Sequence, residues 1–418
     1  MSGPAELAGR AMGARLDAGS SAPLAVAFSG GGDSLALLLM AKTWADKAGR
    51  RLIAFTVDHR LQVESGEWAL WCARRAARLD IDHRTLIWHA EKPATGLASA
   101  ARAARHRLIA DAARDAGARV TLFGHTADDV LEAAAMRADG ARVSAPRSWT
   151  PSPVWPEGRG QFILRTLIEV RRAAIRDWLA SLGETWIEDP ANVDMRHARA
   201  RARARIAETS ADPVARPCSP GMLPAATFWP SGDVCLPSTA DDQTSDFVDQ
   251  LAISVLCAAG GERPPRREAV ERLAKRLSSG EAVDATLGGA RVVRAGQFIH
   301  LARETRDRRG RRCEAVTLPA NETIVWDGRF EVRALAAGLT LAQLAGHAAK
   351  LGADVRKRLA AFHPVIRAAM PALIDASGHV ACPTIAPDPR IEIRNLIPAR
   401  MAGASGAIAA EDKVDLFA

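Results

Sequence analysis

The feature that most constrains this sequence is a short run of glycines between an apolar segment and a helix-forming one. Ser29-Gly30-Gly31-Gly32-Asp33-Ser34 follows the apolar run 23–28 and precedes the apolar run 35–40. Glycine has no Cβ, so the backbone can curl tightly and turn its N–H groups toward a phosphate at the start of the helix. The pattern therefore predicts a strand, a phosphate-binding loop and a helix.

Two common phosphate-binding patterns do not fit these residues. Gly-x-x-x-x-Gly-Lys-Ser/Thr is absent, and so is Gly-x-Gly-x-x-Gly. The loop offers two hydroxyls instead, Ser29 and Ser34, and the carboxylate of Asp33, which could cap the helix or hold a magnesium ion. A plain turn between a strand and a helix is the alternative. The apolar segments on both sides favour phosphate binding.

The first half of the chain alternates short apolar segments with longer helical ones. We expect strands at 23–28, 52–57, 83–88, 120–124 and 162–165, and helices from the glycine loop to about 48 and at 64–79, 98–116, 127–137 and 171–181. This order predicts an α/β fold with a doubly wound parallel sheet. Ligands bind at the carboxyl ends of such strands, so residues 29–34, Asp58, His59 and His125 are expected on one edge.

The length of 418 residues exceeds that of one ordinary domain. We expect a catalytic domain over 1–206, a helical and loosely structured linker over 207–245, and a smaller C-terminal α+β region over 246–418. In that last region the patterns predict helices at 247–259, 266–277 and 341–351 and a β-meander at 282–301. Residues 144–160, rich in Ser, Pro and Gly, are expected to form a surface loop.

Charge and cysteine content narrow the classes of function. The net charge of +8 favours polyanionic partners without locating a site. The six cysteines form no Cys-x-x-Cys pair, which argues against a zinc ribbon or an iron–sulfur cluster. No apolar run approaches the ~18 residues of a membrane span. We therefore expect a soluble, cytoplasmic protein with no membrane partner.

A second group of polar residues, His125 to Glu132, directly follows the strand expected at 120–124. Asp129 and Glu132 lie three positions apart and share a helix face, next to Asp128. Acidic residues in a first turn also stabilise a helix through its dipole, and for Asp128 alone that interpretation is preferred. The whole set predicts metal or amine binding, with His125 as a donor to a phosphate or an oxyanion.

Arginines form the third group of candidates. Arg102 and Arg105 lie three apart in the helix expected at 98–116 and could reach one anion, although a solvated helix face is the alternative. Asp-Pro-Ala-Asn at 189–192 precedes alternating arginines at positions 196, 199, 201, 203 and 205. Dispersed positive charge of this kind suits a phosphate backbone. A generic basic helix is the alternative.

Together these motifs resemble those of the tRNA(Ile)-lysidine synthases, a family of the PP-loop ATP pyrophosphatases. The matching segments run in order over residues 20–205: Ser-Gly-Gly-x-Asp-Ser at 29–34, Asp-His at 58–59, Ala-Arg-x-x-Arg at 101–105, His-x-x-Asp-Asp-x-x-Glu at 125–132, Arg-Thr-Leu at 165–167 and Asp-Pro-x-Asn at 189–192. The resemblance implies a fold like that of the adenine nucleotide alpha hydrolases.

The resemblance also implies a two-step reaction. ATP adenylates the wobble cytidine of a CAU-anticodon tRNA(Ile) at its 2-carbonyl oxygen, and the ε-amine of free lysine then displaces AMP. The implied catalytic residues are Asp33, Arg105, His125, Asp129 and Glu132. The other implied roles are ATP binding by Ser29, Gly30, Gly31, Gly32, Asp33, Ser34, Asp58 and His59, Mg²⁺ binding by Asp33 and Asp128, lysine binding by Asp129 and Glu132, and tRNA binding by Arg196, Arg199, Arg201, Arg203, Arg205 and the C-terminal region.

Two alternatives stay open at this point. One is another PP-loop enzyme that acts on tRNA, such as a thiolase, and the other is a non-catalytic RNA-binding relative. Thiolases normally use paired or catalytic cysteines, and none lies near the motifs in the sequence. The intact Asp33, Asp129 and Glu132 favour an enzyme. The sequence leaves the oligomeric state open, with a homodimer as one option.

Overall fold

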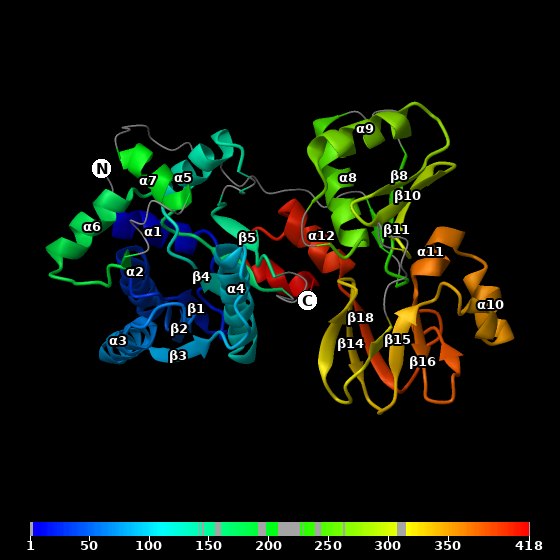
Figure 1. Cartoon of the computed structure of the whole chain (residues 1–418), viewed down its shortest axis with the longest axis horizontal. Coiled ribbons are helices and arrows are strands. Elements are labelled where there is room, and N and C mark those ends of the chain that lie inside the picture. Colours follow the sequence, from blue (N-terminus) through cyan, green and yellow to red (C-terminus); the bar gives the residue numbers. More distant parts are fainter. Residues whose placement is uncertain are drawn as a thin grey trace. The chain divides into compact units, whose positions relative to one another are not determined.

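The computed structural model describes residues 3–141, 143, 146–154, 160–190, 198–207, 226–228, 230–238, 244–261, 264–306 and 315–417. The chain forms two compact units, Met1–Pro220 with Ile408–Ala418, and Gly221–Ala407 (Figure 1). The expected residues Ala191, Asn192 and Arg196 lie outside the described residues. Among the helices described, none combines the length and apolar character that a membrane span needs.

The first unit is built on a six-stranded sheet whose order is β3-β2-β1-β4-β6-β5. Neighbouring strands run parallel except β5, which lies antiparallel to β6 at the edge. The strands are β1 (Leu24–Ala27), β2 (Leu52–Asp58), β3 (Asp82–Ile87), β4 (Val120–Leu122), β5 (Trp149–Pro151) and β6 (Phe162–Leu164). The expected α/β fold with a mostly parallel sheet is confirmed. The strand order reverses between β1 and β4, which is where such sheets bind ligands.

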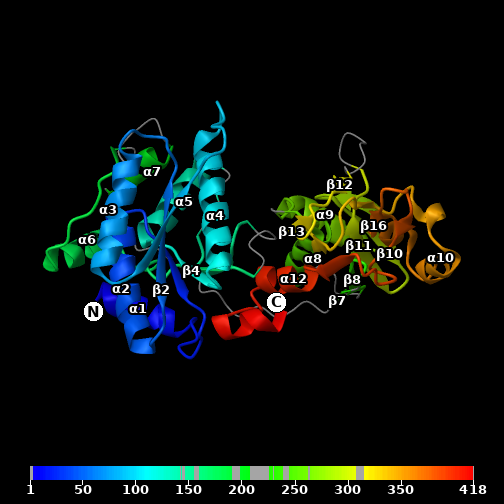
Figure 2. The same cartoon turned by 90° about the horizontal axis from the view of Figure 1, so that it is seen from below.

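Helices cover both faces of this sheet (Figure 2). The helices of this unit are α1 (Pro4–Gly13), α2 (Gly32–Ala48), α3 (Ser65–Arg78), α4 (Leu97–Asp115), α5 (Ala127–Ala138), α6 (Arg172–Ser181) and α7 (Ala198–Ala207). On one face Ile109 and Ala113 of α4 pack against Phe55 of β2 and Ile163 of β6. Helix α2 is buried on several sides, with Leu35 and Leu38 fully covered, because it contacts the sheet as well as α1 and α6.

The edge strand β5 corrects the expectation that residues 144–160 form only a surface loop. Trp149 is 3% exposed, stacks on Phe162 with ring centroids 4.9 Å apart, and donates from Nε1 to the carbonyl of Ile408 at 2.7 Å. The strand is only three residues long, and it is held by pairing with β6 and by a contact with Ile408, which is distant in the sequence. Local composition therefore gave no sign of it.

The second unit contains three antiparallel sheets, in agreement with the expected α+β region. Helices α8 (Ser245–Ala258), α9 (Arg267–Ser278) and α12 (Ile397–Ser405) share an apolar core with the first of these sheets. That sheet consists of β7 (Thr227–Phe228), β8 (Val234–Pro237), β11 (Phe298–Arg303), β10 (Ala290–Ala295) and β9 (Asp284–Leu287). The meander expected at 282–301 is confirmed as β9, β10 and β11.

The other two sheets complete the second unit. They consist of β12 (Val316–Thr317), β15 (Thr340–Gln343), β16 (Pro371–Ile374) and β17 (Val380–Ala381), and of β13 (Thr323–Trp326), β14 (Phe330–Ala334) and β18 (Ile391–Asn395). Short helices accompany them: η2 (Ala348–Lys350), α10 (Ala353–Leu359) and α11 (Pro364–Ala369). The helix expected at 341–351 was wrong, because Leu341 lies in β15 and pairs with Leu373 of β16. Cross-strand pairing outweighs the helical spacing of its apolar residues.

The unit boundaries differ from the expected domains at two places. Strands β7 and β8 belong to the second unit, although they lie in the range 207–245 that was expected to be a linker. The segment from Ile408 through η3 (Glu411–Phe417) belongs to the first unit. In both places the chain is held by partners that are distant in sequence, so composition alone could not assign it.

A buried ion pair fastens the C-terminal segment to the first unit. Nη1 and Nη2 of Arg50 donate to the two oxygens of Glu411, at 2.7 and 2.9 Å, and each side chain is 1% exposed. Glu411 also accepts from the backbone N–H of Asp17 at 3.0 Å. Both oxygens of this carboxylate thus accept hydrogen bonds from groups of the first unit.

We expect Glu411→Ala to lower the free energy of unfolding of the first unit by about 3–5 kcal/mol, because it leaves the Arg50 charge buried without its partner. Hydrogen exchange of the β1 and β2 amides measures this change without requiring both units to unfold together. The matched control is Asp46→Asn, which removes an exposed ion pair with Lys42 and is expected to cost less than about 1 kcal/mol. Equal effects of the two substitutions would contradict the prediction.

Candidate active site

The carboxyl ends of four parallel strands bring the candidate residues to one edge of the sheet. Ser29 follows β1, Asp58 ends β2, His125 follows β4 and Arg165 follows β6. The expectation that the glycine loop, Asp58-His59 and His125 share an edge is therefore confirmed. The loop and the His125 segment flank the point where the strand order reverses.

The glycine loop forms as the sequence predicts and is braced by its two serines. Gly30 has φ +83°, a value that side chains disfavour, and Gly31 is the N-cap of α2. The Ser34 hydroxyl donates to the carbonyl of Gly31 at 2.8 Å and accepts from the N–H of Ser29 at 3.2 Å. The two serine hydroxyls lie 3.1 Å apart. The loop is thus held in place before any ligand arrives.

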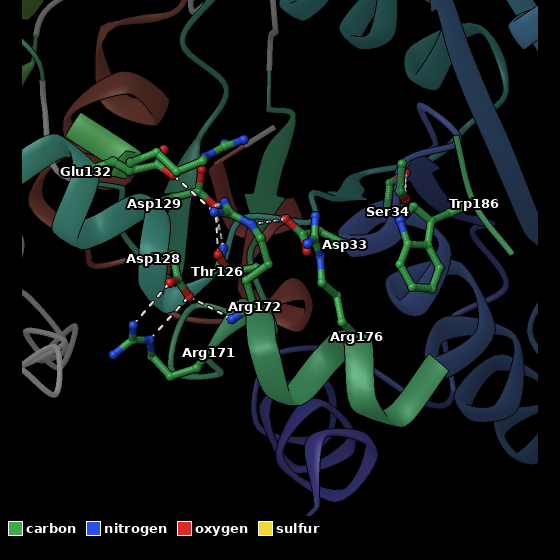
Figure 3. Close-up of polar contacts among 12 residues, drawn as sticks. Asp33, Ser34, Thr126, Asp128, Asp129, Glu132, Arg171, Arg172, Arg176 and Trp186 are labelled. Carbon is green, nitrogen blue, oxygen red and sulfur yellow. Dashed lines mark hydrogen bonds and ion pairs between the residues drawn. The ribbon is translucent and has the colours of Figure 1, made fainter. Parts of the chain in front are cut away.

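The segment at Trp186 and Ile187 packs directly against this loop. A Cβ on Gly30 would lie 2.4 Å from Cδ1 of Ile187, and one on Gly32 would touch the Trp186 ring at 3.4 Å. The N–H of Ile187 donates to the carbonyl of Gly30 at 3.0 Å. Figure 3 shows Trp186 beside Ser34. Packing against Ile187 therefore requires glycine at position 30, whether or not the loop binds a phosphate.

The acidic group sits in the first two turns of α5. Thr126 is the N-cap, and its N–H and hydroxyl both donate to Oδ2 of Asp129, at 2.7 and 3.0 Å. Glu132 lies one turn later with its side chain 1% exposed. The other oxygen of Asp129 and both oxygens of Glu132 point to a common set of guanidinium groups. The shared face expected for Asp129 and Glu132 is confirmed.

Arg172, at the start of α6, joins the glycine loop to the acidic group (Figure 3). Its Nε donates to Asp33 at 2.9 Å, its Nη1 to Glu132 at 3.1 Å, and its Nη2 lies 3.6 Å from Asp129. Burial by itself lowers the pKa of Arg172, but Asp33, Asp129 and Glu132 raise it above its ordinary value. One cation thus binds three carboxylates from two distant parts of the chain.

Two of the arginines expected to bind tRNA form ion pairs with the acidic group. Arg199 donates to Asp129 and, from Nε, to Glu132 at 2.7 Å, and Nε of Arg203 donates to Glu132 at 2.9 Å. They lie four positions apart and face α5. Arg201 is exposed, and Arg205 forms an exposed ion pair with Asp139 at 2.6 Å. Three guanidinium groups therefore balance three carboxylates.

Asp128 is used by the protein itself. Its carboxylate accepts from Nε and Nη2 of Arg171, both at 3.3 Å, and from the backbone N–H of Arg172 at 2.6 Å, so it caps α6. Among the described residues no group of three or more His, Cys, Asp or Glu side chains is arranged for a metal ion. Mg²⁺ takes one or two carboxylates and completes its shell with phosphates and water. Asp33, in the first turn of α2, fits such an ion better than Asp128, whose carboxylate is occupied at the start of α6.

The environment of Asp33 favours a cationic partner. Burial raises the pKa of its carboxyl group and the charge of Asp129 adds to this, while Arg172 acts in the opposite direction. A carboxylate in such surroundings gains stability from any cation that replaces or joins Arg172. The residue therefore suits the role of a metal ligand beside a triphosphate.

Two arginines, Arg105 and Arg165, also lie near Asp129. Nε of Arg165 donates to Nδ1 of His125 at 3.0 Å. Burial and the charges of Arg165 and Arg105 hold the pKa of His125 well below its ordinary value. Burial and the charge of Arg102 lower the pKa of Arg105 to about 10, and within the described residues its buried Nε has no hydrogen-bond partner. These positive charges suit the binding of an anion.

The remaining sequence candidates lie at the end of β2. Asp58 is buried and accepts from the N–H of Arg60 at 2.8 Å. Burial, together with the charge of Arg105, lowers the pKa of His59. Asp189 accepts from Nε2 of Gln62 at 3.2 Å, so the start of the Asp-Pro motif lies beside this strand end. The structure thus gathers these motifs on the same edge.

Sequence reasoning missed Arg171, Arg172 and Trp186. The helix that carries both arginines was expected at 171–181, and α6 spans Arg172–Ser181. The one available signal was charge balance, because three clustered carboxylates require cations when they are buried. Nothing in the sequence indicates which of the many arginines supply them.

The sequence matches one family model and several known proteins. Residues 10–210 match the family model described as a PP-loop domain. The chain is similar to the tRNA(Ile)-lysidine synthase of Caulobacter vibrioides, with 44% identity over 94% of this chain and 96% of that protein. It is also similar to that of Hyphomonas neptunium, with 35% identity over 70% and 85%. The solved U34-tRNA thiolase NcsA of Methanococcus maripaludis gives a TM-score of 0.41 at 13% identity, covering 48% of this chain and 71% of that one.

Proposed function

This chain belongs to the tRNA(Ile)-lysidine synthase family, and from that premise we propose how its first unit performs the family's reaction. It is an ATP-using ligase that modifies tRNA(Ile), joining lysine to the wobble cytidine of the CAU anticodon. The observation that carries the proposed site is the bridge made by Arg172, which unites the glycine loop with the acidic residues of α5.

In the first step the 2-carbonyl oxygen of cytidine attacks the α-phosphorus of ATP, and the bond to the pyrophosphate oxygen breaks. We propose that the backbone N–H groups of residues 29–34 and the hydroxyls of Ser29 and Ser34 bind the departing pyrophosphate, with Asp58 and His59 beside the nucleoside. The N-terminus of α2 favours negative charge at this place. Arg105 and His125 stabilise the charge that develops on the transferred phosphate.

We propose that Asp33 holds the Mg²⁺ ion that accompanies ATP. Held there, the ion would supply positive charge for the phosphates and for the leaving pyrophosphate. For Asp33 to bind it, the contact with Arg172 must loosen, and Arg172 keeps Glu132 and Asp129 as partners when it does. Asp128 was expected as a second ligand, but its hydrogen bonds to α6 support a structural role.

In the second step the ε-amine of lysine attacks C2 of the adenylated cytidine, and the carbon–oxygen bond to AMP breaks. We propose that Asp129 and Glu132 bind the lysine and accept the proton that its ε-ammonium must lose before attack. Both carboxylates are already paired, so lysine must displace a guanidinium. Arg199 is the natural one to leave, because its side chain is 44% exposed while that of Arg172 is 14% exposed.

A thiolase role is not favoured by the cysteines that the structure describes. Cys72, Cys235, Cys257 and Cys382 are buried. Cys72 lies nearest the glycine loop, 3.0 Å from where a Cβ on Gly30 would stand, and burial raises the pKa of its thiol to about 11. Sulfur transfer uses a thiolate, which such surroundings disfavour.

For the tRNA we propose contacts from Arg196, Arg201 and Arg205 and from the second unit. The two arginines of this group that the structure describes are exposed, whereas Arg199 and Arg203 form ion pairs with the acidic group of α5. We further propose that the enzyme works in the cytoplasm, where its tRNA substrate is found. A homodimer stays a prediction that light scattering of the purified protein can test.

The reaction is tested by incubating the full chain with ATP, Mg²⁺, labelled lysine and a CAU-anticodon tRNA(Ile) transcript. We expect label in the tRNA and one AMP released per lysine incorporated. The matched control is the same transcript with U in place of the wobble C, which offers no cytidine to adenylate and should stay unlabelled. Absence of label together with absence of lysine-dependent AMP release would reject the proposed function.

A further inference from the structure

The hydrogen bond between Arg165 and His125 defines where the imidazole carries its proton. Nε of Arg165 lies 3.0 Å from Nδ1 of His125, and both side chains are buried. A guanidinium has five N–H donors and no acceptor, and it stays protonated in proteins. Nδ1 must therefore be the acceptor, and a nitrogen that accepts carries no proton.

The second ring nitrogen has no such partner. Among the residues that the structure describes, Nε2 of His125 makes no hydrogen bond. A neutral imidazole has one proton, so with Nδ1 accepting, the proton lies on Nε2. His125 thus presents an N–H donor on the side away from Arg165.

The surroundings fix both partners of this bond. The ring of His125 stacks on Phe123 at 6.0 Å with an interplanar angle of 10°, and its backbone N–H donates to the carbonyl of Phe123. Nη1 of Arg165 donates to the carbonyl of Arg147 at 2.8 Å, and its backbone N–H donates to that of Ser148. The residues just before β5 therefore hold Arg165 in place.

We propose that Arg165 is a positioning residue, which keeps His125 neutral with its proton on Nε2, so that His125 acts as a hydrogen-bond donor and not as a base. Its acceptor is a phosphate oxygen that gains charge while cytidine is adenylated. The identity of this acceptor rests on the proposed function, whereas the placement of the proton does not.

The charges around the ring agree with a neutral donor. Burial is the main cause that lowers the pKa of His125, and Arg165, Arg105, Arg102 and Arg199 lower it further. On the other face of Phe123, His106 is neutral as well, because burial lowers its pKa to about 2. The pKa of Arg165 is lowered to about 10, mainly by burial, so this side chain keeps its charge at neutral pH.

The proton is located directly by NMR of the full chain with ¹⁵N-labelled histidine. The chain has ten histidines, and His125→Gln identifies the signal of interest by its loss. We expect Nε2 of His125 to have a chemical shift typical of a protonated nitrogen, and Nδ1 that of an unprotonated one, from pH 6 to 8. A proton on Nδ1 in this range overturns the proposal.

Kinetics of Arg165→Met test the consequence for catalysis. We expect pyrophosphate release at pH 8 to fall by about 10- to 100-fold in kcat, with KM for ATP nearly unchanged, because the neutral ring can now place its proton on Nδ1. Loss of the Arg165 charge also raises the pKa of His125. The defect should therefore shrink at lower pH, where the imidazolium carries protons on both nitrogens.

Two further variants separate positioning from folding. Arg165→Lys keeps a charged donor and should recover part of the activity, whereas Arg51→Met removes an exposed arginine of the same unit and should change nothing. A defect of Arg165→Met that is equal at every pH, and equal in Arg165→Lys, would mean that Arg165 only supports the fold. If the proton lies on Nε2 but the wild-type chain forms no lysidine, the proposed function fails and the positioning role stands.

Discussion

Replacing Asp33 with asparagine is expected to lower the rate of tRNA-dependent pyrophosphate release by about 10³-fold, which is the size of effect seen when a preorganised charge is removed from an active site. The amide would keep the shape of the side chain but lose the charge that we propose for Mg²⁺. The fold should survive, because Arg172 keeps Glu132 and Asp129 as partners. Pyrophosphate is measured in single turnover with saturating ATP and tRNA.

The matched control for this experiment is Asp46→Asn. Asp46 lies in the same helix, α2, and its carboxylate forms an exposed ion pair with Lys42. This variant should release pyrophosphate at the wild-type rate. Raising the Mg²⁺ concentration should restore part of the activity of Asp33→Asn if the residue binds the ion. Unchanged turnover in Asp33→Asn would show that the glycine loop does not bind the triphosphate of ATP.

Glu132→Gln is expected to separate the two steps of the reaction. Lysine incorporation should fall by at least about 100-fold, because the substitution removes the charge that holds an ammonium group and accepts its proton. Pyrophosphate release should stay within about threefold of wild type, since the phosphate loop is intact. Adenylated tRNA should therefore accumulate, and it can be detected by a label on the α-phosphate of ATP.

Asp139→Asn is the control for Glu132→Gln. Asp139 ends the same helix and also pairs with an arginine of α7, Arg205, but this pair is exposed. Its loss should leave both steps unchanged. The thermal midpoint of each variant is recorded beside its activity, because Glu132 contacts three guanidinium groups. A parallel fall of both steps in a well-folded Glu132→Gln would contradict a role confined to lysine.

The parts of the fold that the sequence predicts are those for which the local pattern of residues determines the element. Strands β1, β2 and β4 are apolar runs, and the helices between them begin and end near glycines and polar caps, so local patterns suffice. Strand β15 owes its structure to hydrogen bonds with β16, and edge strand β5 to hydrogen bonds with β6. The spacing of Leu341 and Leu344 fits a helix as well, and only the pairing with β16 decides between the two.

In the candidate site, too, some features depend on local sequence and others on contacts between separate parts of the chain. The glycine loop and the Asp129–Glu132 pair each depend on a few consecutive residues, and both have the predicted local form. Their counterions come from the starts of α6 and α7, which follow in the chain by 40 residues or more. Alternating arginines in α7 suggest a surface for RNA. Arg199 and Arg203 instead form ion pairs with the carboxylates of α5, while Ala200 and Ala202 beside them are buried.

The return of the C-terminal segment to the first unit makes the second unit an insertion that is attached at both ends. Both connections are covalent. Where the chain returns to the first unit, it is also held by the hydrogen bond from Trp149 to Ile408 and by the ion pair of Arg50 with Glu411. A protease that cuts the backbone once between residues 207 and 226 would leave two polypeptides that these contacts of the C-terminal segment still hold together. Such a nicked enzyme should migrate as one particle on gel filtration and come apart only in denaturant.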